Sequence, residues 1–139
     1  MTYIFDSNIL IYLAFKGAKE HLAARNVTDR IFAAQEIVIL TEAVVLSFLR
    51  ISTSLKPTSL TSIEAQIFLD ALLDYPQIQL FAPSLRHYKS LTANLVKGKI
   101  KGNLVMDAHL AEVALLTNST IITNDDDFKK FPRVKFINI

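Results

Sequence analysis

Apolar residues in this chain alternate between short unbroken runs and longer segments where they recur at helical spacing. The short runs are continuous rather than alternating, which indicates strands that are buried on both faces. The five predicted strands are TYIF (2–5), EIVIL (36–40), IQLFA (78–82), TIIT (120–123) and VKFINI (134–139). The pattern therefore predicts a mostly parallel sheet of about five strands.

The segments between these strands carry apolar residues at the spacing of amphipathic helices. Ser7 or Asn8 is the predicted N-cap of the first helix, which spans residues 9–15. Thr41 is the predicted N-cap of the helix TEAVVLSFLRISTSL. The other predicted helices lie in KGAKEHLAARNVTDRIFAAQ, SIEAQIFLDALLDY, PSLRHYKSLTANLVKG and NLVMDAHLAEVALLTN, of which the last two end at Gly98 and Asn118. Alternating strands and helices predict one α/β domain over residues 1–139, with helices on both faces of the sheet.

Composition narrows the class of protein. Hydrophobic residues make up 51% of the 139 residues, enough for a sizeable core. The formal net charge of +2 is small, so a polyanionic partner has to be inferred from local charge. The chain has no cysteine, which excludes disulfides and thiolate metal sites and favours a reducing, cytoplasmic location. No apolar stretch is long enough for a transmembrane helix, and Asp6 interrupts any secretory leader.

Acidic residues stand directly after two of the predicted strands. Asp6 follows the first strand, and the triplet Asp125, Asp126 and Asp127 follows the fourth. In an open parallel sheet, sites form beyond the carboxyl ends of the strands, where the winding reverses. If the first and fourth strands are neighbours there, these acids converge on one crevice. Asp107 lies early in an otherwise apolar helix, where a divalent cation would offset the cost of burying its charge.

Each of these acids also fits a purely structural role. Asp6 fits a helix N-cap as well as it fits a site, and an acidic triplet is more commonly a solvated turn. Asp107 is also placed to interact with the dipole of its helix. What favours a shared site is the joint occurrence of these acids around the strand ends of one sheet.

Three segments hold the acids in a recognisable order. FDSNILIY places Asn8 two residues after Asp6, NLVMDAHLAEVAL contains Asp107, and IITNDDDFKKFP contains the pattern Thr-x-Asp-x-Asp-Phe. These segments resemble the first, third and last motifs of PIN-domain proteins, specifically of VapC-type toxin ribonucleases. FLRIST and GNLVMDAHLA are similar to one VapC subgroup. The resemblance spans the whole chain and implies a PIN-like fold and a metal-dependent endoribonuclease, the toxin of a type II toxin–antitoxin pair.

The resemblance also implies a role for each matched residue. These are the metal-binding acids Asp6, Asp107 and Asp125, the further catalytic acid Asp127, and the supporting residues Asn8 and Thr123. Asp126 lies between the positions of the motif and is expected at the surface. The implied cofactor is Mg²⁺ or Mn²⁺, and the implied partners are an RNA substrate, a cognate antitoxin protein and a second copy of the chain in a homodimer.

One position departs from the family pattern. The family has a Glu about six residues after the Ser or Thr that starts the helix following the second strand. Thr41 fits that start, but Ser47 stands where the Glu is expected, so we count Ser47 as a supporting residue and Glu42 as a catalytic candidate. Glu42 is the nearest acid, yet it lies about 140° around the helix from Ser47. Either Glu42 reaches the metal from the helix start, or the site works with fewer acids, or Glu112 contributes.

The other polar residues suggest substrate binding rather than a second catalytic group. The three histidines lie on different helices without metal-ligand spacing, so we expect His21 and His87 at the surface and no role shared by His109 and Asp107. Basic residues near the crevice would hold RNA through its phosphates, although each alone also fits a solvated surface. The candidates are Arg50, Lys97, Lys99, Lys101 and Lys129, with Lys130 beside the last.

Three functions remain open from the sequence. They are a toxin endoribonuclease, a PIN nuclease of RNA processing, and a PIN-like RNA-binding module with weak or no activity, which Ser47 would explain. A phosphate-receiver domain is excluded because the third strand ends in FAPS rather than in a phosphoacceptor Asp. The helix SIEAQIFLDALLDY offers apolar positions that fit either a partner surface or the core: Ile63, Ile67, Leu69, Ala71 and Leu72.

Overall fold

All five predicted strands form, and every neighbouring pair of strands runs parallel. The computed structural model describes residues 1–139. The strands are β1 (Thr2–Phe5), β2 (Ile37–Thr41), β3 (Ile78–Phe81), β4 (Thr120–Thr123) and β5 (Lys135–Asn138). Their order across the sheet is β3-β2-β1-β4-β5. The predicted parallel α/β architecture is therefore confirmed.

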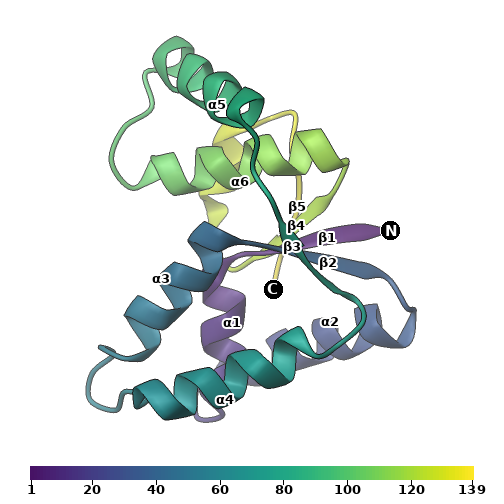
Figure 1. The fold of residues 1–139 in the computed structure, drawn as a ribbon, viewed down its shortest axis with the longest axis vertical. Coiled ribbons are helices and arrows are strands. Elements are labelled where there is room, and N and C mark those ends of the chain that lie inside the picture. Colours follow the sequence, from purple (N-terminus) through teal and green to yellow (C-terminus); the bar gives the residue numbers. More distant parts are fainter.

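Helices cover both faces of the sheet, with α5 and α6 on one side and α1 to α4 on the other (Figure 1). The helices are α1 (Ser7–Ala14), α2 (His21–Ala33), α3 (Glu42–Ser52), α4 (Ser62–Leu73), α5 (Leu85–Gly98) and α6 (Leu104–Thr117). Because the central strands are covered on both faces, consecutive residues such as Ile121 and Ile122 are both fully buried. None of the helices has the length and apolar character needed to span a bilayer.

The helix ends agree with the sequence in part. Thr41 caps α3 as predicted, because Val44 N donates to its Oγ1 at 3.2 Å. The N-cap of α1 is Asp6, not Ser7 or Asn8, since the Asp6 carboxylate accepts a hydrogen bond from the first helical amide. Asn118 ends α6 in the left-handed conformation, as predicted. At the end of α5 that conformation falls on Lys99, one residue beyond Gly98.

The predicted turn at the acidic triplet is instead a short 3-10 helix, η1 (Asp126–Lys130). Asp125 is its N-cap, because the Asp125 carboxylate accepts from Asp127 N at 2.8 Å. Phe128 is fully buried and packs against Phe131 and Phe136, with ring centroids 6.2 and 6.0 Å away. One buried aromatic ring thus anchors the acidic segment to the core.

The structure divides the apolar positions of α4, which the sequence left open between the core and a partner surface. Leu69 and Leu72 are buried, whereas Ala71 is exposed. Ile63 and Ile67 are 69% and 64% exposed, and the buried residues of this helix are Ala65, Leu69 and Leu72. The sequence did not distinguish these faces, because apolar residues occur around most of the helix. Ile63 and Ile67 therefore form an apolar surface that core packing does not explain.

The strand order creates the site. β1 lies between β2 and β4, because the chain adds β2 and β3 on one side of β1 and then crosses to add β4 and β5 on the other. Phe5 pairs with Ile122, which places Asp6 level with Thr123 at the carboxyl end of the sheet. The predicted adjacency of the first and fourth strands is confirmed, and it brings Asp6 beside the acidic segment after β4.

Candidate active site at the ends of β1 and β4

Asp6 is buried and held by hydrogen bonds. Only 8% of the residue is exposed, and its carboxylate accepts from Ser7 N and Thr123 Oγ1, each at 2.7 Å, and from Asn8 Nδ2 at 3.3 Å. Burial raises the pKa of Asp6, and the bonds from Thr123 and Ser7 oppose that rise. The neighbouring Asp125 charge raises this pKa further. Asp6 is thus both the cap of α1 and an acid that faces the site.

Thr123 connects Asp6 to the acidic segment. Its hydroxyl donates to Asp6 and accepts from Asp125 N at 3.1 Å and from Asn8 Nδ2 at 3.3 Å. An ionised carboxylate can only accept, so the amide nitrogen of Asn8 must be the atom that faces Asp6. The other end of that amide, Asn8 Oδ1, is buried and has no hydrogen-bond partner in the protein. Two of the predicted supporting residues, Asn8 and Thr123, are therefore in contact with Asp6, and Asn8 offers an oxygen without a partner.

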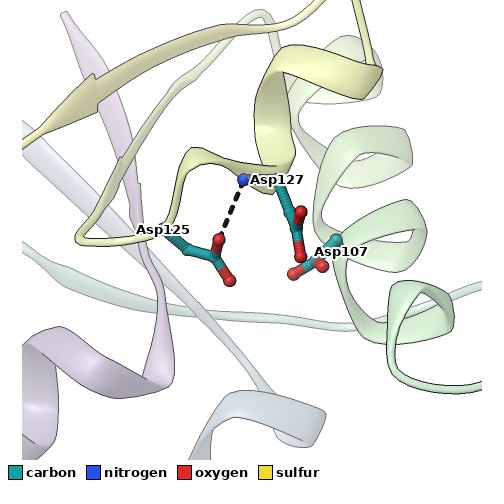
Figure 2. A group of neighbouring side chains, drawn as sticks. All are labelled: Asp107, Asp125 and Asp127. Atoms are coloured by element: carbon teal, nitrogen blue, oxygen red, sulfur yellow. Dashed lines mark hydrogen bonds between the residues drawn. The ribbon is translucent and has the colours of Figure 1, made fainter.

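Three carboxylates meet next to this network. Asp107 extends from the first turn of α6 toward Asp125 and Asp127, which flank the start of η1 (Figure 2). Each of the three offers one oxygen, and these oxygens lie within 4.8 Å of one another. We call these residues the aspartate cluster. Lys130 Nζ donates to Asp127 at 2.7 Å, so one cation faces three acids.

The pKa of Asp107 reflects this crowding. Burial raises it to about 6, and the charges of Asp6, Asp125 and Asp127 add to the rise, whereas Lys130 lowers it. Carboxylate oxygens are the ligands that Mg²⁺ and Mn²⁺ prefer, and a divalent cation among them would relieve the mutual repulsion. Together with the unpartnered oxygen of Asn8, the donor set fits a divalent ion.

The pH dependence of ion binding follows from this pKa. A proton on Asp107 competes with the ion, so we expect the affinity for Mn²⁺ to fall as the pH drops below about 6. The stability of the metal-free protein changes with pH in the opposite direction to its metal affinity. The raised pKa of Asp107 contributes to the free energy of unfolding below pH 3.8, and this contribution is lost as the pH rises through about 6. Calorimetric Mn²⁺ titrations and thermal melts between pH 4 and pH 8 measure both effects. An affinity that is constant from pH 5 to pH 8 would contradict the assignment.

Neither of the two candidate glutamates, Glu42 and Glu112, belongs to the aspartate cluster. Glu42 is exposed at the start of α3 and lines a different cavity with Leu46 and His109, and it is not part of the aspartate cluster. Ser47 is half-buried one turn further along the helix. Glu112 accepts hydrogen bonds from Ser90 Oγ and Asn94 Nδ2, so it joins α6 to α5. The aspartate cluster therefore forms without a glutamate.

The predicted RNA-binding residues are exposed but scattered. Arg50 lies in the last turn of α3, and Lys97, Lys99 and Lys101 lie around the α5–α6 connection. Lys129 pairs with Asp126 at 3.0 Å on the outer surface, which agrees with the expected surface position of Asp126. Lys130 was named in the sequence analysis only as the neighbour of Lys129, yet it is the lysine that contacts the aspartate cluster.

The prediction of surface histidines is wrong for His87. His87 is 3% exposed, and its Nε2 lies 3.1 Å from His109 Nδ1. Burial, and then His87 itself, lowers the pKa of His109. His21 is half-buried, with Nδ1 2.7 Å from the Tyr12 carbonyl oxygen. The buried imidazole of His87 and the half-buried one of His109 form a contact between α5 and α6, one that sequence spacing within single helices does not reveal.

A parallel α/β domain with acids gathered at the switch between β1 and β4 is the arrangement of the PIN domain. The sequence profile of the PIN domain family matches residues 3–134, and the chain belongs to this family. Among its relatives are VapC ribonuclease Mb2897 of Mycobacterium bovis and ribonuclease VapC43 of Mycobacterium tuberculosis. Each is 30% identical over 94% of this chain and 90% of its own length.

Solved structures agree with this assignment. VapBC2 from Rickettsia felis, crystallised with a DNA fragment of its promoter, matches with a TM-score of 0.70 and 25% identity, over 99% of this chain and 98% of that chain. VapC20 of Mycobacterium tuberculosis, a toxin that cleaves the sarcin–ricin loop, matches over the same shares with a TM-score of 0.70 but 12% identity. The second likeness shows the fold alone.

Proposed function

We propose that this protein is a metal-dependent endoribonuclease and the toxin of a VapBC-type pair. The observation that carries the proposal is the aspartate cluster, in which three carboxylates crowd together and only Asp127 bonds to a lysine, at the switch point of a PIN fold. The relatives named as ribonucleases cover nearly the whole chain, which supports the same activity here.

Asp107, Asp125 and Asp127 are the residues that would hold Mg²⁺ or Mn²⁺, so Asp127 takes the place that the family resemblance gave to Asp6. Such an ion, when bound, stabilises charge on the phosphate and makes a water nucleophilic at neutral pH. The carboxylates need to stay ionised and fixed in place. The hydrogen bond from Asp127 N fixes Asp125, and the first turn of α6 positions Asp107. Lys130 is placed to balance charge next to a bound phosphate.

Asp6, Asn8 and Thr123 position this machinery. Asp6 adds negative potential to the cluster from a buried position, and Thr123 fixes the distance between β1 and the start of the acidic segment. The unpartnered amide oxygen of Asn8 is a further oxygen donor for an ion or for its water shell. The absence of a glutamate from the cluster is compatible with activity, because metal sites of this kind complete their coordination with waters.

The proposal includes protein partners. The exposed Ile63 and Ile67 on α4 give an antitoxin or a second copy of the chain an apolar surface to bury. Because RNA is the substrate, the proposal places the activity in the cytoplasm.

The proposed activity is tested with total RNA and a stem–loop RNA incubated with Mn²⁺, with Mg²⁺ or with EDTA. We expect cleavage with either ion, none with EDTA, and loss of cleavage in Asp125→Asn. Asp126→Asn is the matched control, because Asp126 is adjacent in sequence but bonds to Lys129 and Asn138 on the outer surface. Cleavage that survives EDTA, or that Asp125→Asn leaves unchanged, would contradict the proposal.

The position of Ser47 favours one alternative, a PIN-like RNA-binding protein without nuclease activity. That alternative predicts RNA binding without cleavage in any of the divalent ions. A nuclease of RNA processing would instead cleave RNA without stopping growth. We expect induced expression in a bacterial host to arrest growth, and Asp125→Asn to relieve the arrest.

A further inference from the structure

A groove runs along α5 and α6 beside the aspartate cluster. One of its two cavities, of about 390 Å³, lies between these helices, Lys130 at the end of η1 and the segment 131–134 that follows. We call it the main cavity because it includes Lys130. A second cavity of about 500 Å³ shares Asn94, Glu112, Leu115 and Arg133 with it, so the two are continuous. In Figure 1, the C-terminal segment (yellow) passes behind α6 and below α5. We call the combined space the α5–α6 groove.

The lining of the α5–α6 groove is cationic. Lys97, Lys130 and Arg133 line the main cavity, and Arg86 lines the second. Lys97, Arg86 and Arg133 form no ion pair within the protein, so their charges are available to a ligand. Glu112 is the only acid in the lining, and both of its oxygens accept hydrogen bonds from α5. An excess of fixed positive charge favours a phosphate-bearing ligand.

The floor of the main cavity is apolar. Ile100, Leu115, Phe131 and Val134 contribute to it, and Leu115 is 39% exposed. Solvent-accessible apolar surface beneath cationic side chains suits an unpaired nucleobase, which stacks on apolar and aromatic groups while its phosphates bind lysine and arginine. A base-paired helix would not fit this arrangement, because its bases are turned inward.

Lys130 connects the groove to the chemistry. It lines the main cavity, and its Nζ donates to Asp127 of the aspartate cluster. The charges of Asp125 and Asp107 also raise the pKa of Lys130, after the larger effect of the hydrogen bond to Asp127. Lys130 therefore lies between the groove and the aspartate cluster, next to which a scissile phosphate would bind.

We propose that the α5–α6 groove binds the single-stranded RNA next to the scissile phosphate and seats at least one unpaired base on its apolar floor. This inference rests on the proposed nuclease function. It assigns phosphate binding to Lys97, Lys130, Arg133 and Arg86, whereas Arg50, Lys99, Lys101 and Lys129 do not line the groove.

The test compares Lys97→Ala/Arg133→Ala with Lys89→Ala, an exposed lysine on the same helix α5 that lines neither cavity. All substituted residues are exposed, so thermal melts should match that of the wild type. Binding of a fluorescent single-stranded RNA is measured by anisotropy in Ca²⁺ buffer at several salt concentrations. We expect the double variant to bind roughly 10-fold more weakly or worse. Its logarithmic salt slope should fall by about 1.4, because each phosphate contact on a single strand adds about 0.7.

The base seat has its own readout. A cleavable oligonucleotide with one abasic nucleotide beside the cleaved bond should be cut with a KM at least about 5-fold higher, because stacking of that base is lost. Lys89→Ala should cleave the intact oligonucleotide and the abasic one with the same KM values as the wild type.

The outcomes separate the two proposals. If the wild type cleaves RNA and the double variant binds RNA as tightly as the wild type does, the groove assignment is overturned. The nuclease function is then still supported. A double variant that loses affinity for an antitoxin protein but not for RNA would also overturn the groove assignment, since the groove would then bind protein. If the wild type neither binds nor cleaves RNA, both proposals fail.

Discussion

Asp107→Asn is expected to reduce RNA cleavage by at least about 100-fold, while raising the melting temperature of the metal-free protein at pH 7 to 8. Removing a residue that only hydrogen-bonds to a metal ligand already lowers metal affinity or activity roughly 10–100-fold. Asp107 is itself one of the three carboxylates in the cluster. Burial, and then repulsion from three other acids, raises the pKa of the same carboxylate to about 6. Replacing it with a neutral amide removes this repulsion. Cleavage assays and thermal melts in EDTA measure the two effects.

The response to metal separates this explanation from a general gain in stability. Mn²⁺ should raise the melting temperature of the wild type substantially and that of Asp107→Asn far less, because the variant has lost a ligand. Asp126→Asn, outside the cluster, should respond to Mn²⁺ as the wild type does. An Asp107→Asn protein with a wild-type Mn²⁺ shift would show that the ion binds elsewhere.

Phe128→Ala should lower the free energy of unfolding by about 3–5 kcal/mol, because it empties a fully buried aromatic position. Phe128 directly follows Asp127 and anchors η1 against Phe131 and Phe136. The loss of this ring should also make Asp125 and Asp127 more mobile and weaken Mn²⁺ binding in the fraction of the protein that stays folded. Urea denaturation gives the first quantity and calorimetry at low temperature the second.

Phe48→Ala is the matched control for this effect. Phe48 is also fully buried, but it lies on α3 and packs against Phe68 rather than near the acids. It should destabilise the protein by a similar amount and leave the Mn²⁺ affinity of the folded protein unchanged. Equal losses of Mn²⁺ affinity in both variants would mean that η1 has no special role in holding the cluster.

Much of the fold was predictable because the strands are covered on both faces. Burial on both sides leaves continuous apolar runs such as TIIT, and these runs alternate with helices in the order that a parallel sheet requires. Asp6 and Asp125 were predictable as neighbours because parallel strands end at the same edge of the sheet. The family resemblance then supplied the roles that spacing alone left open.

The features that sequence reasoning missed depend on how helices pack together. His87 looked like a surface residue on α5, and only the packing of α5 on α6 brings it to His109. In the same way, Lys97 and Arg133 lie 36 positions apart and line one groove, whereas Lys99 and Lys101, close to Lys97 in sequence, do not. Whether Ile63 and Ile67 face the core or a partner stayed open from the sequence, because a helix with apolar residues all around gives no signal of its orientation.

The acids come from three distant parts of the chain: the end of β1, the first turn of α6 and the start of η1. The set is complete only when η1 has been synthesised and β4 has paired with β1. A chain that is truncated before η1 should therefore lack the aspartate cluster, however well its earlier elements fold.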